Sequence, residues 1–185
     1  MAQDATEVRL GVTGYLYKAP VGSTAPTDED TALNAAFVEL GYTETGPSIS
    51  VDTSTETFTP WQSVTPVRET VTGQIITATF TLWQTNAANL KLAWGGGTVT
   101  ASTGGTKFTP PATPTVNEGA FVFEVIDGSV IDRWYIPRAS ITLAGDISFA
   151  KDGVTGYPIS VKYLQPASGT PWVLFTNNAD VPADA

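Results

Sequence analysis

The sequence predicts a mainly β domain, a sandwich or barrel of roughly eight to ten strands. One short α-helix and one long extended hairpin arm complete the expected fold. The first observation is composition: only 15% of the 185 residues are charged, and 17 Gly and 13 Pro supply frequent turns. Secondly, short segments that alternate polar and apolar residues recur between those turns. Thirdly, residues 48–81 alternate like a strand, yet 14 of these 34 residues are Ser or Thr, too polar a content for a core.

The length fits one domain that is large enough to bury a real core, so we expect residues 1–185 to form a single unit. Five tryptophans, six tyrosines and eight phenylalanines need burial somewhere. That aromatic content argues against disorder for the bulk of the chain.

The N-terminal third is expected to contain two strands around one or two helical turns. Residues 7–19 alternate, with Val8, Leu10 and Val12 on one face, and predict a first strand. Thr27 and the acidic run 28–30 resemble a helix N-terminus that continues through residue 34. Residues 37–42 are expected to form a short strand ended by a glycine.

The long polar segment is expected to be an arm, about 48–68, that another subunit buries. Residues 52–59 are polar and extended, and prolines at 60 and 66 break the middle. Residues 67–83 predict the longest strand, with an apolar face and a threonine face. We expect 67–81 to belong to the sheet and 53–66 to become ordered only on assembly. The apolar face is Ile76, Ala78, Phe80 and Leu82, and the other is Thr77, Thr79, Thr81 and Trp83.

The second half of the chain is expected to hold the helix and the remaining strands. Asn86 can cap a helix at about 86–94, with Leu90, Ala93 and Trp94 as its packing stripe, before three glycines stop it. A loop with a weak hairpin signal follows at 98–114. Strands are expected at 120–126 and 130–136 around an Asp-Gly turn, weakly at 139–149, and at 157–164 and 171–176, before a flexible tail at 177–185.

The residue inventory excludes most chemistry. Cysteine and histidine are both absent, so disulfides, Ser/His/Asp and Cys/His catalysis and the usual zinc sites are excluded. The glycine runs at 95–97 and 104–105 miss the GxxxxGK[ST] spacing of a phosphate loop. The acidic run 28–30 lacks the spacing of a calcium loop. We therefore expect no cofactor, no metal and no enzyme.

Two groups of residues remain as candidates for a site. Glu124, Asp127 and Asp132 are the best carboxylate trio for glycosidase-type catalysis, although the solvated face and turn of a hairpin explain them better. Trp94 and Trp172 are expected in the core. Trp61 lies at the tip of the arm, where it could anchor an interface or form part of a sugar platform.

The charge balance is strongly acidic. Nine Lys and Arg against 18 Asp and Glu give a net charge of −9 and a pI near 4.2, so the chain is not expected to grip phosphate backbones. The start MAQDATEVRL has no signal-peptide pattern, and no apolar run reaches transmembrane length. Synthesis in the cytoplasm, without membrane contact, is the expectation.

The order of these elements resembles the major tail tube proteins of long, non-contractile-tailed (siphovirus-type) bacteriophages, particularly those of actinobacterial hosts. The likeness covers nearly the whole chain and is carried by GVTGYLYKAPVGSTAPTD, ALNAAFVELGY, the arm STETFTPWQSVTPVRETVT, TATFTLWQTNAANLKLAWGGG and GYPISVKYLQPASGTPWVLF. It implies a tail-tube β-barrel or sandwich whose subunits form stacked hexameric rings, with the hairpin reaching the neighbouring ring. Further implied are a virion location in the phage tail, DNA passing through the lumen without specific binding, and tape measure, tail terminator and distal tail proteins as partners.

Within that family picture, five arm residues are the candidate inter-subunit residues. Asp52, Glu56 and Glu69 are expected as interface or lumen-adjacent acids, Arg68 as an ion-pair partner, and Trp61 as the anchor. A β-sandwich binding or decoration module that recognises carbohydrate or a host receptor is the alternative function. A carboxylate hydrolase is a third.

Overall fold

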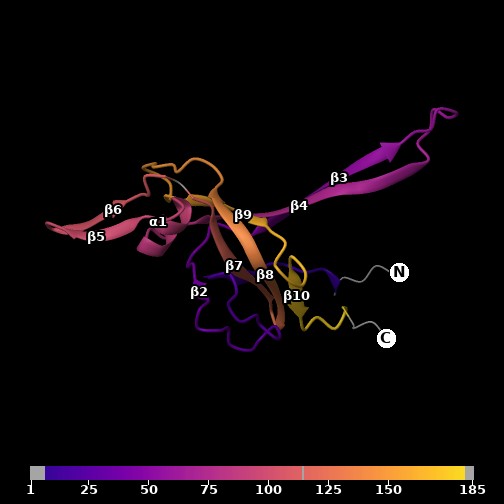
Figure 1. Cartoon of the computed structure of the whole chain (residues 1–185). Coiled ribbons are helices and arrows are strands. Elements are labelled where there is room, and N and C mark those ends of the chain that lie inside the picture. The colour runs from indigo at the N-terminus through magenta and orange to yellow at the C-terminus, as the bar shows by residue number, and fades with distance from the viewer. Residues whose placement is uncertain (1–6, 114, 182–185) are drawn as a thin grey trace.

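The computed structural model describes residues 7–113 and 115–181 (Figure 1). These residues form an antiparallel sheet in the order β2-β1-β7-β8-β9-β4-β3, with β10 paired to β8, and a separate two-stranded hairpin β5-β6. The mainly β prediction is confirmed. The elements are β1 Thr13–Ala19, β2 Val38–Glu39, β3 Ser48–Phe58, β4 Arg68–Leu82, α1 Ala87–Ala93, β5 Thr98–Ser102, β6 Gly105–Thr109, β7 Asn117–Asp127, β8 Val130–Leu143, β9 Tyr157–Tyr163 and β10 Val173–Thr176.

The sheet curls until strands that are not neighbours face each other across the core. The ring centroids of Phe80 on β4 and Phe123 on β7 lie 6.0 Å apart in an edge-on arrangement. The segment 40–44 spans the gap between the two sides of the curl. The amide of Leu40 donates to the carbonyl of Leu16 at 2.8 Å, and the amide of Glu44 donates to the carbonyl of Thr81 at 3.0 Å.

Alternation in the strands explains which side chains are buried. On β4 the predicted apolar face, Ile76 to Leu82, is buried. On β7, Phe121 and Phe123 enter the main core, whereas Val122 between them joins a smaller cluster with Ala19, Phe37, Ala120 and Tyr135 on the other face. Because both faces of β7 are covered, its sequence reads as a continuous apolar run rather than an alternating one.

The predicted short helix is present as α1, and a buried asparagine ties it to the segments that follow β2 and β4. The side chain of Asn86 caps the helix by accepting from the amide of Asn89 at 2.8 Å. The side chain of Asn89 donates to the carbonyls of Leu40 (3.1 Å) and Gln84 (2.9 Å). The predicted packing stripe is right for Ala93, which is buried, and for Leu90, which packs partly buried against the core. It is wrong for Trp94, which is 47% exposed, whereas Asn89 and Leu92 are buried instead.

The first strand is shorter than predicted. It begins at Thr13, not at residue 7, and the apolar side chains at 8, 10 and 12 are exposed. Its partner β7 ends at Asp127, whose carboxylate accepts from the amide of Leu10 at 3.0 Å. The chain before Thr13 therefore passes the end of its partner strand and has no ladder to join.

The helix predicted at 27–34 does not form. The carboxylate of Asp28 accepts from the amide of Thr31 at 2.7 Å and from its hydroxyl at 2.6 Å, and the chain bends there. Arg133 donates hydrogen bonds to the carbonyls of Asp28 and Thr31, and a helix would need these carbonyls as acceptors for its own backbone amides. The acceptor is Asp28, within the predicted acidic run, and it stabilises a bend rather than a helix N-terminus.

The remaining elements follow the sequence pattern with shifted ends. The hairpin of β7 and β8 turns at Asp127-Gly128 as predicted, with Gly128 at a φ of 63°. The weak alternation at 139–149 is strand only as far as Leu143. Asn177, in the expected tail, bonds to the backbone of Ser129 and Ile131, and residues 182–185 lie outside the described part. In that part of the chain, no helix is long and apolar enough to cross a membrane.

Replacing Phe123 by Ala should lower the free energy of unfolding by about 3–5 kcal/mol, because the ring is fully buried at the point where the two sides of the sheet meet. Urea unfolding of the monomer measures it. The matched control is Val64→Ala, a change at a 99% exposed site that should stay within about 0.5 kcal/mol of the parent. Equal losses in both variants would contradict this account of the core.

Candidate assembly surfaces

The arm is a two-stranded ribbon that projects from the sheet (Figure 1). All of β3 is exposed, and so is β4 from Arg68 to Ile75. β9 pairs with β4 only from Thr77 to Leu82, so the outer half of β4 has β3 as its partner. This corrects the expectation that residues 67–81 all belong to the domain's sheet. At about 3.4 Å per residue, the exposed ribbon reaches on the order of 25 Å beyond the core.

The register of the ribbon places the predicted interface charges. Asp52 pairs with Ile75, Glu56 with Thr70 and Phe58 with Arg68, which puts Asp52, Glu56 and Arg68 on one face. Glu69 pairs with Thr57 and lies on the opposite face. In the described residues none of these four charged side chains forms an ion pair within the subunit. Three of the predicted charges therefore share a face that is open to a partner.

A β-bulge interrupts the ribbon halfway along. The pairing shifts between Ser54 and Thr55, which leaves Thr72 without an opposite residue, and the hydroxyl of Thr72 donates to the carbonyl of Ser54 at 3.2 Å. A bulge increases the local twist of a hairpin. It therefore sets the direction in which the outer ribbon and its tip point.

The tip of the arm presents an uncharged apolar knob. The amide of Val67 donates to the carbonyl of Phe58 at 2.9 Å, which closes the loop 59–67. Trp61 in this loop is 98% exposed, and Val64 is also free of the core. The loop TPWQSVTPV contains no ionisable side chain. An indole held so far from its own core is typical of an interface anchor.

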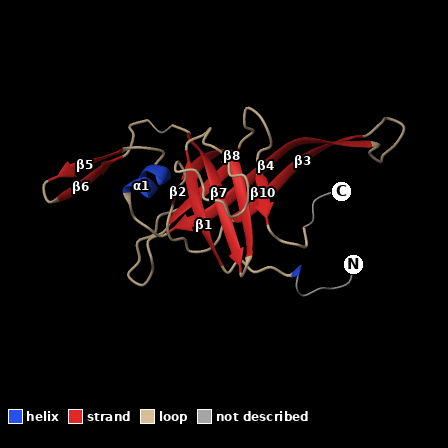
Figure 2. Cartoon of the chain, turned by 90° about the horizontal axis from the view of Figure 1, so that it is seen from below, coloured by secondary structure: helices blue, strands red, loops and turns tan. Residues whose placement is uncertain are grey.

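A second exposed hairpin, β5-β6, leaves the sheet on the side opposite the arm (Figure 2). Its strands pair from Thr98↔Thr109 to Ser102↔Gly105, and Gly104 in the turn has a φ of 81°. The hairpin signal here is weak, because five threonines and three glycines lie among residues 97–109 and dilute the alternation of polar and apolar residues. The turn glycines were the signal that could have located it.

A pocket of about 670 Å³ lies between the loop 21–25, β8 and the loop 166–170, and we call it the apolar pocket. Arg138 and Glu118 form a two-pronged ion pair in its wall, with Nε–Oε2 at 2.8 Å and Nη2–Oε1 at 3.0 Å. Hydrogen bonds from Arg138 lower the pKa of Glu118. Sequence reasoning missed this pocket, because three distant segments build it. Its apolar lining is Val21, Ala25, Tyr135, Pro137, Pro166, Ala167 and Val173.

A larger hollow of about 900 Å³ follows the edge of β1 and the segment 41–47, and we call it the acidic groove. Glu39, Glu44 and Glu124 line it. Gly14 is required at its floor, since a side chain there would collide with the carbonyl of Glu124. The two hollows thus differ in chemistry, one apolar with a neutral ion pair and the other rich in carboxylates.

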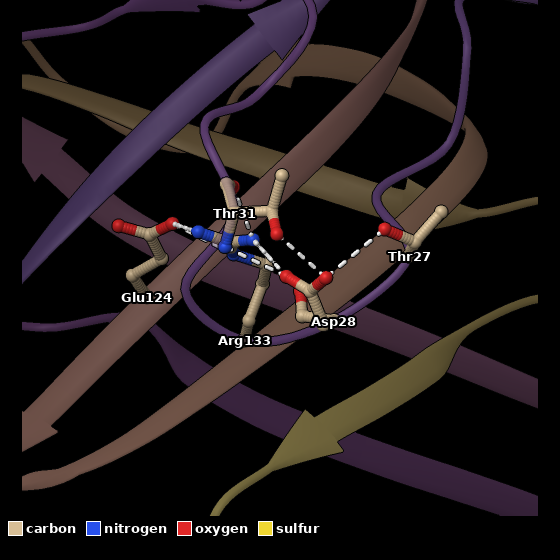
Figure 3. Close-up of polar contacts among 5 residues, drawn as sticks. All are labelled: Thr27, Asp28, Thr31, Glu124 and Arg133. Carbon is tan, nitrogen blue, oxygen red and sulfur yellow. Dashed lines mark hydrogen bonds and ion pairs between the residues drawn. The ribbon is translucent and has the colours of Figure 1, made fainter.

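Arg133 holds the loop 20–36 onto the sheet (Figure 3). The side chain is buried and lies 2.7 Å from the carboxylate of Glu124, measured from Nη2 to Oε1. Nη1 donates to the carbonyls of Asp28 at 2.7 Å and Thr31 at 2.9 Å. Hydrogen bonds from Thr31 lower the pKa of Asp28, so its carboxylate stays charged near Arg133. The loop that forms one wall of the apolar pocket is therefore fixed by a buried cation.

The carboxylate trio does not form a catalytic pair. Glu124 is bound to Arg133, Asp127 accepts from a backbone amide, and Asp132 lies opposite Val125, on the other face from Glu124. In the described ranges no group of three or more acidic side chains could hold a metal.

The two tryptophans expected in the core are partly exposed. Trp94 ends α1 at the surface, and Trp172 is 37% exposed, with its ring centroid 5.0 Å from that of Trp134. Trp172 sits just before the short strand β10, which covers only one edge of β8. Both tryptophans are partly exposed because Trp94 lies at the end of α1 and Trp172 directly precedes β10, and these ends lie at the surface.

A curled antiparallel sheet with a long, fully exposed hairpin has the form of a structural subunit that assembles with others. The family model described as phage tail tube protein matches residues 1–185, and the chain therefore belongs to the phage tail tube protein family. It is thus a structural protein of a bacteriophage tail. A search of the curated proteins finds no match.

Replacing Arg133 by Met should cost about 3–5 kcal/mol of stability, because it leaves the buried carboxylate of Glu124 unpaired. It should also open the loop 20–36 to proteolysis. The double variant Arg133→Met/Glu124→Met should regain most of the stability in urea unfolding.

The proteolysis readout separates the ion pair from the loop contact. The double variant should still be cut in 20–36, because the carbonyls of Asp28 and Thr31 have lost their donor. Arg138→Met is the control, since its half-exposed ion pair lies outside this cluster. A double variant whose loop resists protease as the parent does would refute this role of Arg133.

Proposed function

We propose that this protein is the major tail tube subunit of a siphovirus-type phage and polymerises as stacked hexameric rings around a channel for DNA ejection. The whole chain acts as one tail tube domain, and its arm reaches the adjacent ring. The observation that carries the proposal is the ribbon β3-β4, which is exposed on both faces from its tip to Ile75. An isolated two-stranded ribbon is only marginally stable in water, so contacts with another subunit would stabilise it.

The sheet edges support this assembly. β3 ends the strand order on one side, and the two-residue strand β2 ends it on the other. Exposed edges invite pairing with other chains, and closed rings cover them. A ring closes through a repeated head-to-tail contact between different surfaces, and a stack of rings extends through a second such contact. The subunit offers different surfaces at its two ends, the arm on one side and β5-β6 on the other (Figure 2).

The charges fit a channel that conducts DNA without binding it. The net charge of −9 makes the subunit repel phosphates, and an acidic wall would let a duplex slide. We assign Asp52, Glu56 and Glu69 to the tube interface or the neighbourhood of the lumen. Arg68, which shares a face with Asp52 and Glu56, pairs with an acid of the adjacent subunit in this proposal.

The proposed partners follow from a place within the tail. Copies of the same chain are the main partner, and tape measure, tail terminator and distal tail proteins meet the tube along its lumen and at its ends. The subunit is made in the host cytoplasm and ends in the virion.

A variant with a shortened arm should remain folded and fail to form tubes. Ser54 pairs with Gly73, so residues 55–72 can be replaced by an Asn-Gly turn without breaking the ladder below. In the deleted segment no side chain is buried, and all but Pro60 and Ser63 are exposed, so the midpoint of thermal unfolding should hardly change. Negative-stain electron microscopy of the concentrated protein measures assembly.

The control for this variant is Phe149→Ser, which removes exposed apolar surface outside the arm. It should form tubes as the parent does. If the shortened variant formed tubes, the proposed role of the arm in assembly would be wrong. A parent protein that stays monomeric at high concentration would count against the tube itself.

A further inference from the structure

We propose that Trp61 at the arm tip of one subunit inserts into the apolar pocket of another copy. This inference rests on the proposed self-assembly and names the surface that receives the arm. It joins two features of one chain, a fully exposed indole and a preformed apolar hollow, which are separate within the subunit. A knob that fits a pocket elsewhere on the same molecule gives a head-to-tail contact that repeats from copy to copy.

The pocket is large enough to take the indole together with neighbouring residues of the tip, and its lining suits an apolar ring. Its volume of about 670 Å³ lies in the range of cavities that take drug-sized molecules. Pro137 and Pro166, which lie beside the largely buried Tyr135, offer flat apolar surfaces against which an indole packs. Burial of these surfaces would provide most of the favourable free energy.

The polar groups of the wall also suit a tryptophan. A buried indole needs an acceptor for its N–H, and the carboxylate of Glu118 has lone pairs left beside its bonds to Arg138. The guanidinium of Arg138 can lie over the ring face. Because the two charges already neutralise each other, the arrival of an uncharged ring leaves no isolated charge buried.

The acidic groove is the poorer receptor for the tip. Glu39 and Glu44 line it, and covering them with the uncharged loop 59–67 would remove water from carboxylates without supplying a cation. The apolar pocket carries no such cost. Of these two hollows, the chemistry of the tip selects the apolar one.

The receptor belongs to a second copy rather than to the same chain. Trp61 is 98% exposed in the subunit, and the ribbon points its tip away from the sheet in both views (Figures 1 and 2). The pocket lies on β8 and the loops beside it. Contact between the two therefore requires another subunit.

The first experiment compares polymerisation thresholds of the full-length protein by sedimentation. Trp61→Ala should raise the protein concentration needed for assembly by roughly tenfold or more, as loss of an interface anchor does. Trp61→Phe should recover part of the loss. Ala167→Arg, at an exposed position in the pocket rim, should have the effect of Trp61→Ala. Phe149→Ser, which removes an exposed apolar side chain outside the arm, should assemble as the parent does.

The second experiment does not depend on tube formation. The chain has no cysteine, so single cysteines can be placed without background. A donor carrying Gln62→Cys with Trp61 intact is mixed with an acceptor carrying Ala25→Cys and Trp61→Ala. A bis-maleimide with a reach of about 10 Å, roughly three strand residues, should join them into a covalent dimer. A donor that also carries Trp61→Ala should give none.

The outcomes separate this inference from the proposed function. A covalent dimer, together with a parent protein that forms no tubes, would support the Trp61 contact and contradict the proposed tube. The opposite outcome is that the parent forms tubes, no covalent dimer appears, and Trp61→Ala assembles at the same concentration as the parent. This outcome would overturn the Trp61 contact and support the proposed tube.

Discussion

The structure depends on the way in which β4 changes partners along its length. From Thr77 to Leu82 it pairs with β9 on one side, and β3 pairs with its other side as far as Thr79; the apolar face of this stretch is buried. From Arg68 to Ile75 it pairs with β3 only, and both faces are exposed. One continuous strand thus anchors the core and extends the arm. The buried side chains at its root, among them Phe80 against Phe123, fix the angle at which the arm leaves the sheet.

The arm avoids the risk that an exposed ribbon carries. A long, flat and apolar edge would pair indiscriminately with other chains. Here the ribbon is rich in threonine, carries three acids and one arginine, and is twisted by a bulge. These features discourage unspecific pairing, and the apolar side chains with the highest exposure are instead concentrated in the loop at its tip. Specific association is thereby separated in space from the strand edges.

Alternation along single strands explains why the sequence predicts much of the fold. The predictions of the apolar face of β4 and of the hairpin at Asp127-Gly128 rest on residues that are close together in the sequence, and both predictions are confirmed. The predictions that failed depend on distant partners. Residues 7–12 alternate like a strand but run past the end of β7. Residues 28–31 do not form a helix, because Arg133, about a hundred positions away, donates hydrogen bonds to the carbonyls of Asp28 and Thr31. The apolar pocket could not be predicted, since it exists only once β8 and two loops come together.

The buried ion pair and the apolar pocket are coupled through one loop. Arg133 fixes the carbonyls of Asp28 and Thr31, and a turn in which the amide and hydroxyl of Ser23 both donate to the carbonyl of Pro20 fixes the other end. Val21 and Ala25 lie between these two points and form one wall of the pocket. A rigid wall matters, because binding to a preformed pocket avoids the entropic cost of ordering a loop during association. The desolvation cost of burying Arg133 and Glu124 therefore arises when the subunit folds, and the apolar pocket is already formed before a second subunit binds.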